Sequence, residues 1–428
     1  MNPLNPRNRS DLLRPALPTA ALALAVTAVA VAIAVVPTAA QAAAPRDGAS
    51  GTYNQSRGTV SLTNMTYDTD TADGIAVLVS GGTFNLDGST VTKSGDSSSL
   101  DNTRIYGQNA AVLAEYGGAI NLSGSTIITN GLGASGVFAT NDGSATTVTG
   151  GNVATSGGRS GGAVANTGAT LRVRDTQLTT SGAQSAAAAA TVSDAHLTLT
   201  GGTATATGPA SPALASEGTV TASGTTLRSA ADYAATVNGA NTLTLDHATA
   251  TGGAGGIRAF NSSNGSLRGH ATVTVKGGSL DATGDAFHVD GTTAAVTVQD
   301  GATVTASGNL LDVVGGGTAT FTAVGETLSG DVRATGSSSA TVALTSGTAL
   351  SGAVVGASVS LDADSTWEVT GDSALAAFSD AAGISGDTIT NVTGNGHVVT
   401  YDATLSANSA LGGRTYTLAG GGTLQPAS

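Results

Sequence analysis

The stretch GAINLSGSTIIT, residues 118–129, contains the pattern on which the fold depends. Ile120 and Leu122 stand two positions apart, and Ile127 follows after a Ser-Gly pair at 123–124. Apolar residues at period two indicate a strand with one buried face, and a Ser-Gly pair favours a tight turn. The stretch therefore predicts a strand, a turn and a second short strand.

The same pattern recurs along most of the chain. Equivalents of Leu122 occur about thirteen times, at a mean spacing of about 25 residues. They are Leu62, Leu86, Leu122, Val148, Val173, Leu199, Ala222, Leu245, Val275, Val298, Ala323, Leu344 and Leu361. A period of this length is typical of solenoids, propellers and arrays. Two larger spacings, Leu86 to Leu122 and Leu245 to Val275, predict loop insertions in those repeats.

The residue types select one kind of solenoid. The repeats are rich in Val, Thr, Leu, Gly and Ser, which favours strands and turns over helix pairs. The leucine-rich repeat pattern is absent, and the period is longer than the hexapeptide-based coil of a left-handed β-helix. The predicted fold is therefore all-β, a right-handed parallel β-helix with about 13–15 coils of about 25 residues.

Stacked coils should align equivalent side chains in columns. We expect the Leu122 series to point inward, with a second inward column beside it formed by Val91, Ile127, Val153 and Leu178. The alanine-rich stretch 186–190 could form a helix, but its place in the repeat favours a strand or corner. Repeated Gly-Gly and Ser-Gly pairs fit sharp corners that need positive φ.

Composition narrows the function classes. Charged residues make up 11% of the 428 residues and aromatic residues 3%, whereas compact globular domains carry about 25% charged residues. The formal net charge of −13 disfavours nucleic acid as a partner. The chain has no cysteine, so the fold needs no disulfide and a cytosolic redox motif is excluded.

Residues 1–42 resemble a secretory signal peptide. An apolar run at 19–36 and the small residues Ala-Gln-Ala at 40–42 follow a basic region that holds Arg7, Arg9 and Arg14. The alternative is a retained anchor helix, because the run approaches the length that spans a membrane. The signal peptide predicts a secreted or bacterial cell-surface protein.

The remaining chain divides into three parts. Residues 43–58 are predicted to form an N-terminal cap, because an uncovered coil would expose a pairing edge. Residues 59–366 are the repeats. Residues 367–428, which begin with the only tryptophan, are predicted to form the last coils and a C-terminal cap.

The repeats, the sequence STWEVTGDS at 365–373 and the closing GGRTYTLAGGGTLQP at 412–426 resemble the passenger domains of bacterial autotransporters of the pertactin-like β-helix type. The resemblance covers roughly residues 45–428. It implies export through a C-terminal transmembrane barrel and a role as an adhesin or surface virulence factor. No series of alternating barrel strands follows in this sequence, so three alternatives stay open: release, attachment through a separate partner, or a shortened relative of the family.

One acidic stretch resembles a calcium loop. Asp68, Asp70, Asp73 and Gly74 approach the D-x-D-x-x-D-G spacing, but the third aspartate is one place late and no glutamate follows at the twelfth position. An acidic turn is the favoured interpretation.

Other titratable residues form two candidate groupings. Asp300, Asp312 and Asp331 could line one face. Asp285, His288 and Asp290 form the best carboxylate–histidine grouping; at period two His288 and Asp290 share a face and Asp285 points away. Solvated turn positions are favoured for this second grouping, and surface or turn positions for each of the five histidines: His196, His247, His270, His288 and His397. No catalytic, cofactor or metal residue is assigned, and no cofactor is expected.

Two functions remain open. The first is a non-enzymatic β-helix that binds an extracellular surface, glycan or protein, with the insertions near 93–109 and 259–269 as contact regions. The second is a polysaccharide-active enzyme of the pectate-lyase kind. Such an enzyme needs several acids and sugar-stacking aromatic residues in one groove, and the aromatic residues here are few and dispersed.

Overall fold

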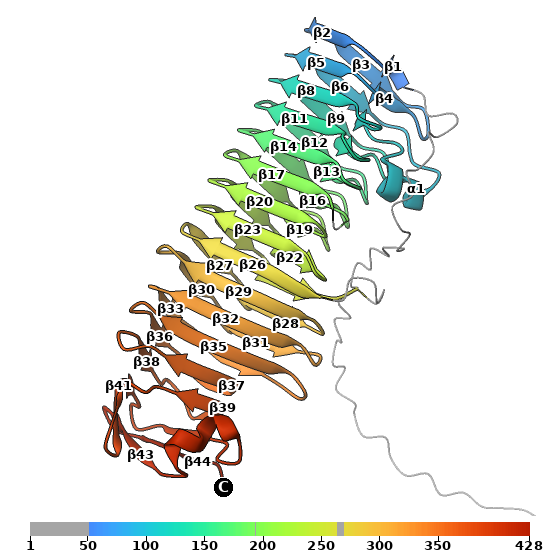
Figure 1. The fold of residues 1–428 in the computed structure, drawn as a ribbon. Coiled ribbons are helices and arrows are strands. Elements are labelled where there is room, and N and C mark those ends of the chain that lie inside the picture. The colour runs from blue at the N-terminus through green and yellow to red at the C-terminus, as the bar shows by residue number, and fades with distance from the viewer. Residues whose placement is uncertain (1–50, 193, 263–268) are drawn as a thin grey trace, which may run out of the picture. The chain divides into compact units, whose positions relative to one another are not determined.

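The computed structural model describes residues 51–192, 194–262 and 269–428. In these segments short strands succeed one another in stacked parallel coils (Figure 1). The predicted parallel β-helix is confirmed, with about 15 turns of about 25 residues and 4% helix. The predicted signal peptide at 1–42 lies outside the described residues.

Most coils contribute one strand to each of three ladders. The first ladder contains β1 (Gly51–Gln55), β4 (Ile75–Val79), β7 (Val112–Ala114), β10 (Val137–Ala139), β13 (Ala163–Ala165), β16 (Ala188–Ala190), β19 (Leu214–Ser216), β22 (Tyr233–Asn238), β25 (Gly255–Phe260), β28 (Phe287–Asp290), β31 (Leu311–Val314), β34 (Val332–Ala334), β37 (Val354–Leu361), β39 (Ser373–Ser379), β42 (Val398–Tyr401) and β44 (Thr423–Pro426). Because β1 pairs with β4, residues 51–55 already belong to the first coil.

The second ladder follows the first around each coil. It contains β2 (Thr59–Thr63), β5 (Thr83–Asp87), β8 (Ala119–Ser123), β11 (Ala145–Thr149), β14 (Thr170–Arg174), β17 (His196–Thr200), β20 (Thr219–Ser223), β23 (Thr242–Asp246), β26 (His270–Lys276), β29 (Thr293–Gln299), β32 (Thr318–Val324) and β35 (Ser339–Thr345). The long strand β37 pairs with both β34 and β35, so the two ladders merge there.

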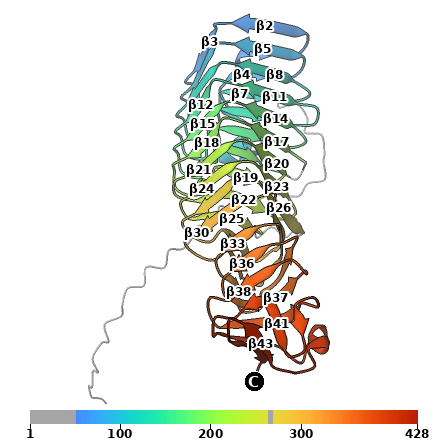
Figure 2. The same cartoon turned by 90° about the vertical axis from the view of Figure 1, so that its left-hand side faces the viewer.

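The third ladder completes the coil (Figure 2). It contains β3 (Thr66–Thr69), β6 (Thr90–Lys93), β9 (Thr126–Thr129), β12 (Asn152–Thr155), β15 (Gln177–Thr180), β18 (Thr203–Ala206), β21 (Thr226–Ser229), β24 (Thr249–Gly252), β27 (Ser279–Ala282) and β30 (Thr303–Ala306). Figure 2 shows the same side continuing through β33 (Thr327–Ser329), β36 (Ala349–Ser351), β38 (Thr366–Glu368), β41 (Thr388–Thr393) and β43 (Tyr416–Ala419).

The core is built from the predicted columns. Leu122 pairs in register with Leu86 on one side and Val148 on the other, and all thirteen marker residues continue this register from Leu62 to Leu361. Every marker except Leu62, in the first coil, is buried. The second column also pairs as predicted, in the order Val91, Ile127, Val153, Leu178. The alanine-rich stretch contributes strand β16, as expected.

Glycine is required where coils approach most closely. At the corner before the first ladder, Gly131, Gly157, Gly182 and Gly208 lie above one another, and a Cβ on each would collide with the backbone carbonyl of the equivalent glycine one coil earlier. At other corners the expected positive φ occurs, for example 53° at Gly124. The corners therefore depend on residues without a side chain.

The first insertion is a packed element. It contains helix α1 (Leu100–Tyr106), whose N-cap Ser99 accepts a hydrogen bond from Asn102 N and which ends at Gly107 in the left-handed conformation. A Cβ on Gly107 would lie within 2.6 Å of Phe138 and 2.8 Å of Leu113. These side chains belong to a small apolar cluster on the outward side of the first ladder. The helix therefore covers apolar surface.

Side chains on both flanks anchor the insertion. The Lys93 ammonium is buried and donates to the carbonyls of Thr71 (2.9 Å) and Gly95 (2.7 Å), while Asn109 Nδ2 donates to Gly95 O at 2.8 Å. Burial lowers the pKa of Lys93, although nearby carboxylates including Asp96 act in the opposite direction. An anchored segment has less freedom to adapt to a partner than a free loop.

Buried polar side chains follow the end of the first ladder. Asn166 Nδ2 donates to Thr191 Oγ1 and to the carbonyl of Arg104 in α1. Farther along, Glu217 Oε1 accepts from Asn238 Nδ2 at 2.7 Å, and Asn238 Oδ1 accepts from Ser262 N. Burial raises the pKa of Glu217 to about 7, although the Asn238 hydrogen bond and the positive charge of Arg104 oppose the rise.

Large aromatic residues fill the last coils. Trp367 is buried and its Nε1 donates to Gly352 O at 2.9 Å. The buried Tyr401 and Tyr416 donate to the carbonyls of Arg414 and Leu411. Antiparallel pairs appear here: β41 with β40 (Ile384–Ser385), and β43 with β44, flanking the short helix η2 (Ser406–Leu411).

Two adjacent isoleucines on β9, one inward and one outward, allow the inward column to be tested by mutation. Ile127 is fully buried, whereas Ile128 is 44% exposed. We expect Ile127→Ala to lower the free energy of unfolding by about 2–5 kcal/mol and Ile128→Ala by about 0.5 kcal/mol or less. Thermal unfolding followed by circular dichroism measures both, and equal shifts would contradict the inward column.

Glu217 should make stability depend on pH. Its raised pKa means that the protonated form is favoured in the folded state, so its contribution is complete below the ordinary glutamate value of 4.5 and is lost as pH rises through about 7. The loss amounts to about 3 kcal/mol at most. We expect Glu217→Gln to gain stability relative to the wild-type protein between pH 5 and 8, in thermal melts. Exposed Glu368→Gln is the control, and parallel pH profiles for wild-type and Glu217→Gln proteins would refute the assignment.

Candidate functional site

The outward side of the first ladder carries a column of charged residues. In the register of β25, β28, β31 and β34, Arg258 lies beside His288, His288 beside Asp312, and Asp312 beside Arg333. The flanking residues on these strands, such as Phe287 and Val289, point into the core. Stacking at about 4.8 Å thus brings together residues that are far apart in sequence.

The centre of the column is the His288 cluster, which we define as Asp285, His288 and Asp312. His288 Nδ1 lies 3.1 Å from Asp312 Oδ2 and 3.5 Å from Asp285 Oδ2. The exposed fraction of the side chain is 17% for His288, 13% for Asp312 and 21% for Asp285. Asp285 precedes β28, where Asn309 donates to its Oδ1 from the backbone N (2.8 Å) and from Nδ2 (2.9 Å). This leaves Asp285 Oδ2 directed to the histidine.

The imidazole is close to both carboxylates but is not well bonded to either. His288 Nδ1 is buried and has no hydrogen-bond partner of good geometry, even though Asp312 Oδ2 is 3.1 Å away. A buried nitrogen of this kind normally has an aligned partner. The cluster therefore has an unused ligand or acid–base position at its centre.

The two carboxyl groups differ in proton affinity. Burial raises the pKa of Asp312, the negative charge of Asp285 adds to the rise, and His288 opposes it. For Asp285 burial also acts to raise the pKa, but the close contact with His288 and the hydrogen bonds from Asn309 outweigh it, so the pKa of Asp285 falls below its ordinary value. Neighbouring carboxyl groups with opposite shifts are a common arrangement for acid–base chemistry.

Aromatic and basic side chains surround the cluster. The Tyr233 ring lies 6.0 Å from the His288 ring, between centroids. Arg258 pairs with Asp290 at 2.8 Å and lies over the Phe260 ring at 5.0 Å. Burial raises the pKa of Tyr233, which keeps the phenol protonated. The neighbourhood thus contains a hydrogen-bond donor, a cation and two ring faces.

The structure corrects the predictions for this region. Asp285 was expected to point away from His288, but it lies in the turn before β28, where strand alternation does not apply, and it contacts the histidine. Asp290 shares the outward face of β28 with His288, as predicted, and it pairs with Arg258. The preference for a solvated turn is wrong for His288, which lies on a strand and is largely covered, and its neighbour Asp312 is covered as well.

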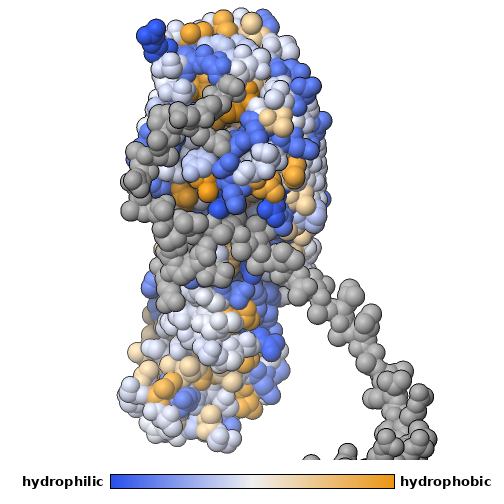
Figure 3. All heavy atoms as spheres, turned by 90° about the vertical axis from the view of Figure 1, so that its right-hand side faces the viewer, coloured by the Kyte–Doolittle hydropathy of each residue, from blue (hydrophilic) through white to orange (hydrophobic). Residues whose placement is uncertain are grey.

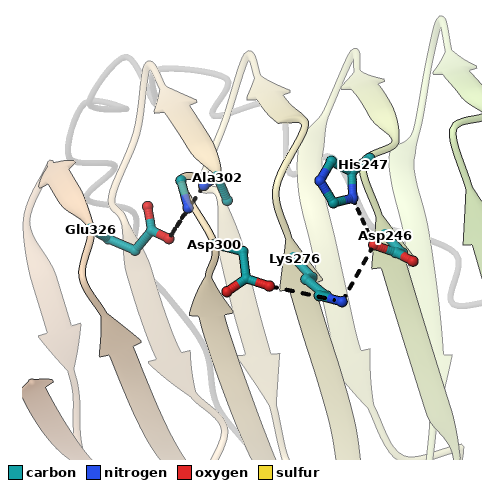
Figure 4. A network of polar contacts seen from close by, with 7 residues as sticks. Asp246, His247, Lys276, Asp300, Ala302 and Glu326 are labelled. Carbon is teal, nitrogen blue, oxygen red and sulfur yellow. Dashed lines mark hydrogen bonds and ion pairs between the residues drawn. The ribbon is translucent and has the colours of Figure 1, made fainter. Parts of the chain in front are cut away.

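Asp300 does not share a face with Asp312 and Asp331. It lies in the turn after β29, where Lys276 Nζ is 3.8 Å from Asp300 and 4.0 Å from Asp246 (Figure 4). His247 joins this network through Asp246 at 2.7 Å. Asp331 precedes β34 and accepts from Ala353 N. The network in Figure 4 is an exposed turn network that links adjacent coils.

Glu326 has a structural role beside that network. Its Oε1 accepts from Gly301 N at 2.8 Å and from Ala302 N at 3.3 Å (Figure 4). The glutamate is buried, and it closes a corner by satisfying two backbone donors.

The remaining candidates are dispersed. His196, His247 and His270 are exposed and His397 is partly exposed, as predicted. Asp68 accepts from Thr92, whereas Asp73 accepts from Ser98 N at 2.8 Å and helps to anchor the insertion. Among the described residues, only the His288 cluster brings three histidine or acidic ligand atoms within 4.8 Å of one another.

Comparisons with known proteins do not assign a family. No protein-family model matches the chain, and no significant match occurs among curated proteins. Within the described residues, no helix has the length and apolar character needed to cross a membrane.

Proposed function

We propose that this chain is an exported β-helix of the autotransporter-passenger type that acts outside the cell as a binding scaffold, and that it recognises a glycan. The resemblance of its repeats and of the segments at 365–373 and 412–426 supports the class, as does the leader-like sequence at 1–42. The long stack of paired coils supports a scaffold role, because it holds surface side chains at fixed spacing.

The observation that carries the proposal is the outer face of the second ladder. Outward threonines on β20, β23, β26, β29 and β32 pair in register and form two parallel columns. The first column contains Thr219, Thr242, Thr272 and Thr320, with Ala295 between the last two. The second column contains Thr221, Thr244, Thr274, Thr297 and Thr322. All these threonines are partly or fully exposed. We call this surface the threonine face.

The threonine face suits an extended polar polymer. Strand geometry spaces its hydroxyl groups by about 4.8 Å along the stack and by about 7 Å across it. Each hydroxyl can donate one hydrogen bond and accept others, as sugar hydroxyls require. A rigid array loses little conformational entropy on binding. The net charge of −13 disfavours polyanions, so the proposal specifies a neutral or cationic glycan.

The surface elsewhere supports this choice. In the part of the chain that the structure describes, the exposed large apolar side chains are dispersed, at Met65, Ile128, Leu132, Val355, Val398 and Leu405. The uncovered part of the side seen in Figure 3 shows small hydrophobic patches between hydrophilic ones. The insertion at 93–109, first expected as a contact region, is anchored at both flanks, and residues 263–268 of the second insertion lie outside the described residues. The proposed contact therefore moves to the threonine face.

Lysine substitutions should block the threonine face. Thr244→Lys combined with Thr274→Lys places two long charged side chains on adjacent coils, and we expect at least about tenfold weaker glycan binding, or about 1.4 kcal/mol. Binding is measured on a glycan array and by titration with the strongest ligand.

The matched control is Thr179→Lys with Thr205→Lys, an adjacent outward pair on β15 and β18 in the third ladder. The control should bind as the wild-type protein does. Equal loss in both double variants, or no glycan binding by the wild-type protein, would refute the proposal.

The His288 cluster favours a second function, a polysaccharide-active enzyme. Asp285 with a lowered pKa could act as a base and Asp312 with a raised pKa as an acid, beside Tyr233 and Arg258. We expect such an enzyme to release reducing or unsaturated ends from a polysaccharide, and Asp312→Asn to abolish the release. This function is excluded if the Asp312→Asn variant keeps the activity, or if the wild-type protein cleaves neither neutral nor acidic polymers.

A further inference from the structure

We propose that Asp285, His288 and Asp312 bind one divalent transition-metal ion of the zinc class, held by His288 Nδ1 and one oxygen of each carboxylate. This site is independent of glycan binding, because it lies on the first ladder and the threonine face on the second.

The distances fit such an ion. Zinc takes nitrogen and oxygen ligands at about 2.0–2.2 Å in tetrahedral geometry, which separates neighbouring ligand atoms by about 3.3–3.6 Å. Nδ1 is 3.5 Å from Asp285 Oδ2 and 3.1 Å from Asp312 Oδ2. All three atoms lie within 4.8 Å of one another.

The buried His288 nitrogen is a second and independent indication. Nδ1 lacks a hydrogen-bond partner of good geometry, so its present surroundings do not satisfy it. A metal ion would accept its lone pair and at the same time neutralise the repulsion between the carboxylates of Asp285 and Asp312. One occupant therefore satisfies all three side chains.

The supporting contacts resemble those around metal ligands. Asn309 binds Asp285 Oδ1 through two donors and leaves Oδ2 free to face the site. The nearest arginine on β25, Arg258, is engaged by Asp290 at 2.8 Å. The alternative is an ion pair in which protonated His288 is the cation between the two carboxylates, and a chain that uses this pair would not bind zinc.

The ligand set selects the metal class. One imidazole with two carboxylates suits zinc and related transition metals, whereas calcium takes six to eight oxygen ligands. Three protein ligands leave a fourth position for water, since the side chains remain 13–21% exposed. The bound ion would thus be open to a further ligand.

Isothermal titration of the EDTA-treated full-length chain with ZnCl₂, and separately with CaCl₂, tests the site. We expect one strong zinc site and no calcium binding there. His288→Gln and Asp312→Asn should each weaken zinc binding at least about 100-fold, and Asn309→Ala about 10–100-fold. Cobalt substitution should give the visible absorption of a tetrahedral site, which His288→Gln abolishes.

His247→Gln is the matched control. His247 Nδ1 also lies close to a carboxylate, 2.7 Å from Asp246 Oδ1, but the His247 side chain is 66% exposed and, among the described residues, forms an ion pair with that one aspartate only. It should bind zinc as the wild-type protein does. Absence of zinc binding, zinc binding lost in His247→Gln, or unchanged zinc binding in His288→Gln would overturn the proposal. Circular dichroism confirms folding, and Asp285→Asn replaces any variant that does not fold.

Discussion

The structure depends on the register between coils. A single coil of about 25 residues has too few bulky side chains to bury its own inward face, and each coil is therefore stable only against its neighbours. Leu86, Leu122 and Val148 show how this is achieved, since each covers the next at the spacing of adjacent strands. A slip of one residue would turn these side chains outward, so the core itself enforces the register.

The same register organises the outer surface. Once the inward columns are aligned, outward residues align as well, whatever their chemistry. On the second ladder this produces repeated hydroxyl groups; on the first it places Arg258, His288, Asp312 and Arg333 in sequence. Side chains that are 21 or more residues apart become neighbours without any dedicated loop.

The sequence predicted the core well because the pattern is redundant. Each marker is confirmed by its neighbours, so even Ala222 and Ala323 could be placed by spacing alone. The His288 cluster was only partly predicted. His288 stands 10 residues before the marker Val298, and Asp312 stands 11 before Ala323, which is a usable signal for a shared ladder. Asp285 and Asn309 lie in turns, where no alternation rule predicts orientation.

The two surfaces place different demands on the scaffold. The threonine face depends only on repetition, so losing one hydroxyl leaves the array largely intact. The His288 cluster depends on three side chains within a few ångströms, and Asp285 is positioned by Asn309 from the following turn. A shift in register between β28 and β31 would separate His288 from Asp312 while leaving most threonines aligned. The cluster is thus the part of the surface most sensitive to the packing beneath it, where Phe287 meets Phe321 with ring centroids 5.6 Å apart.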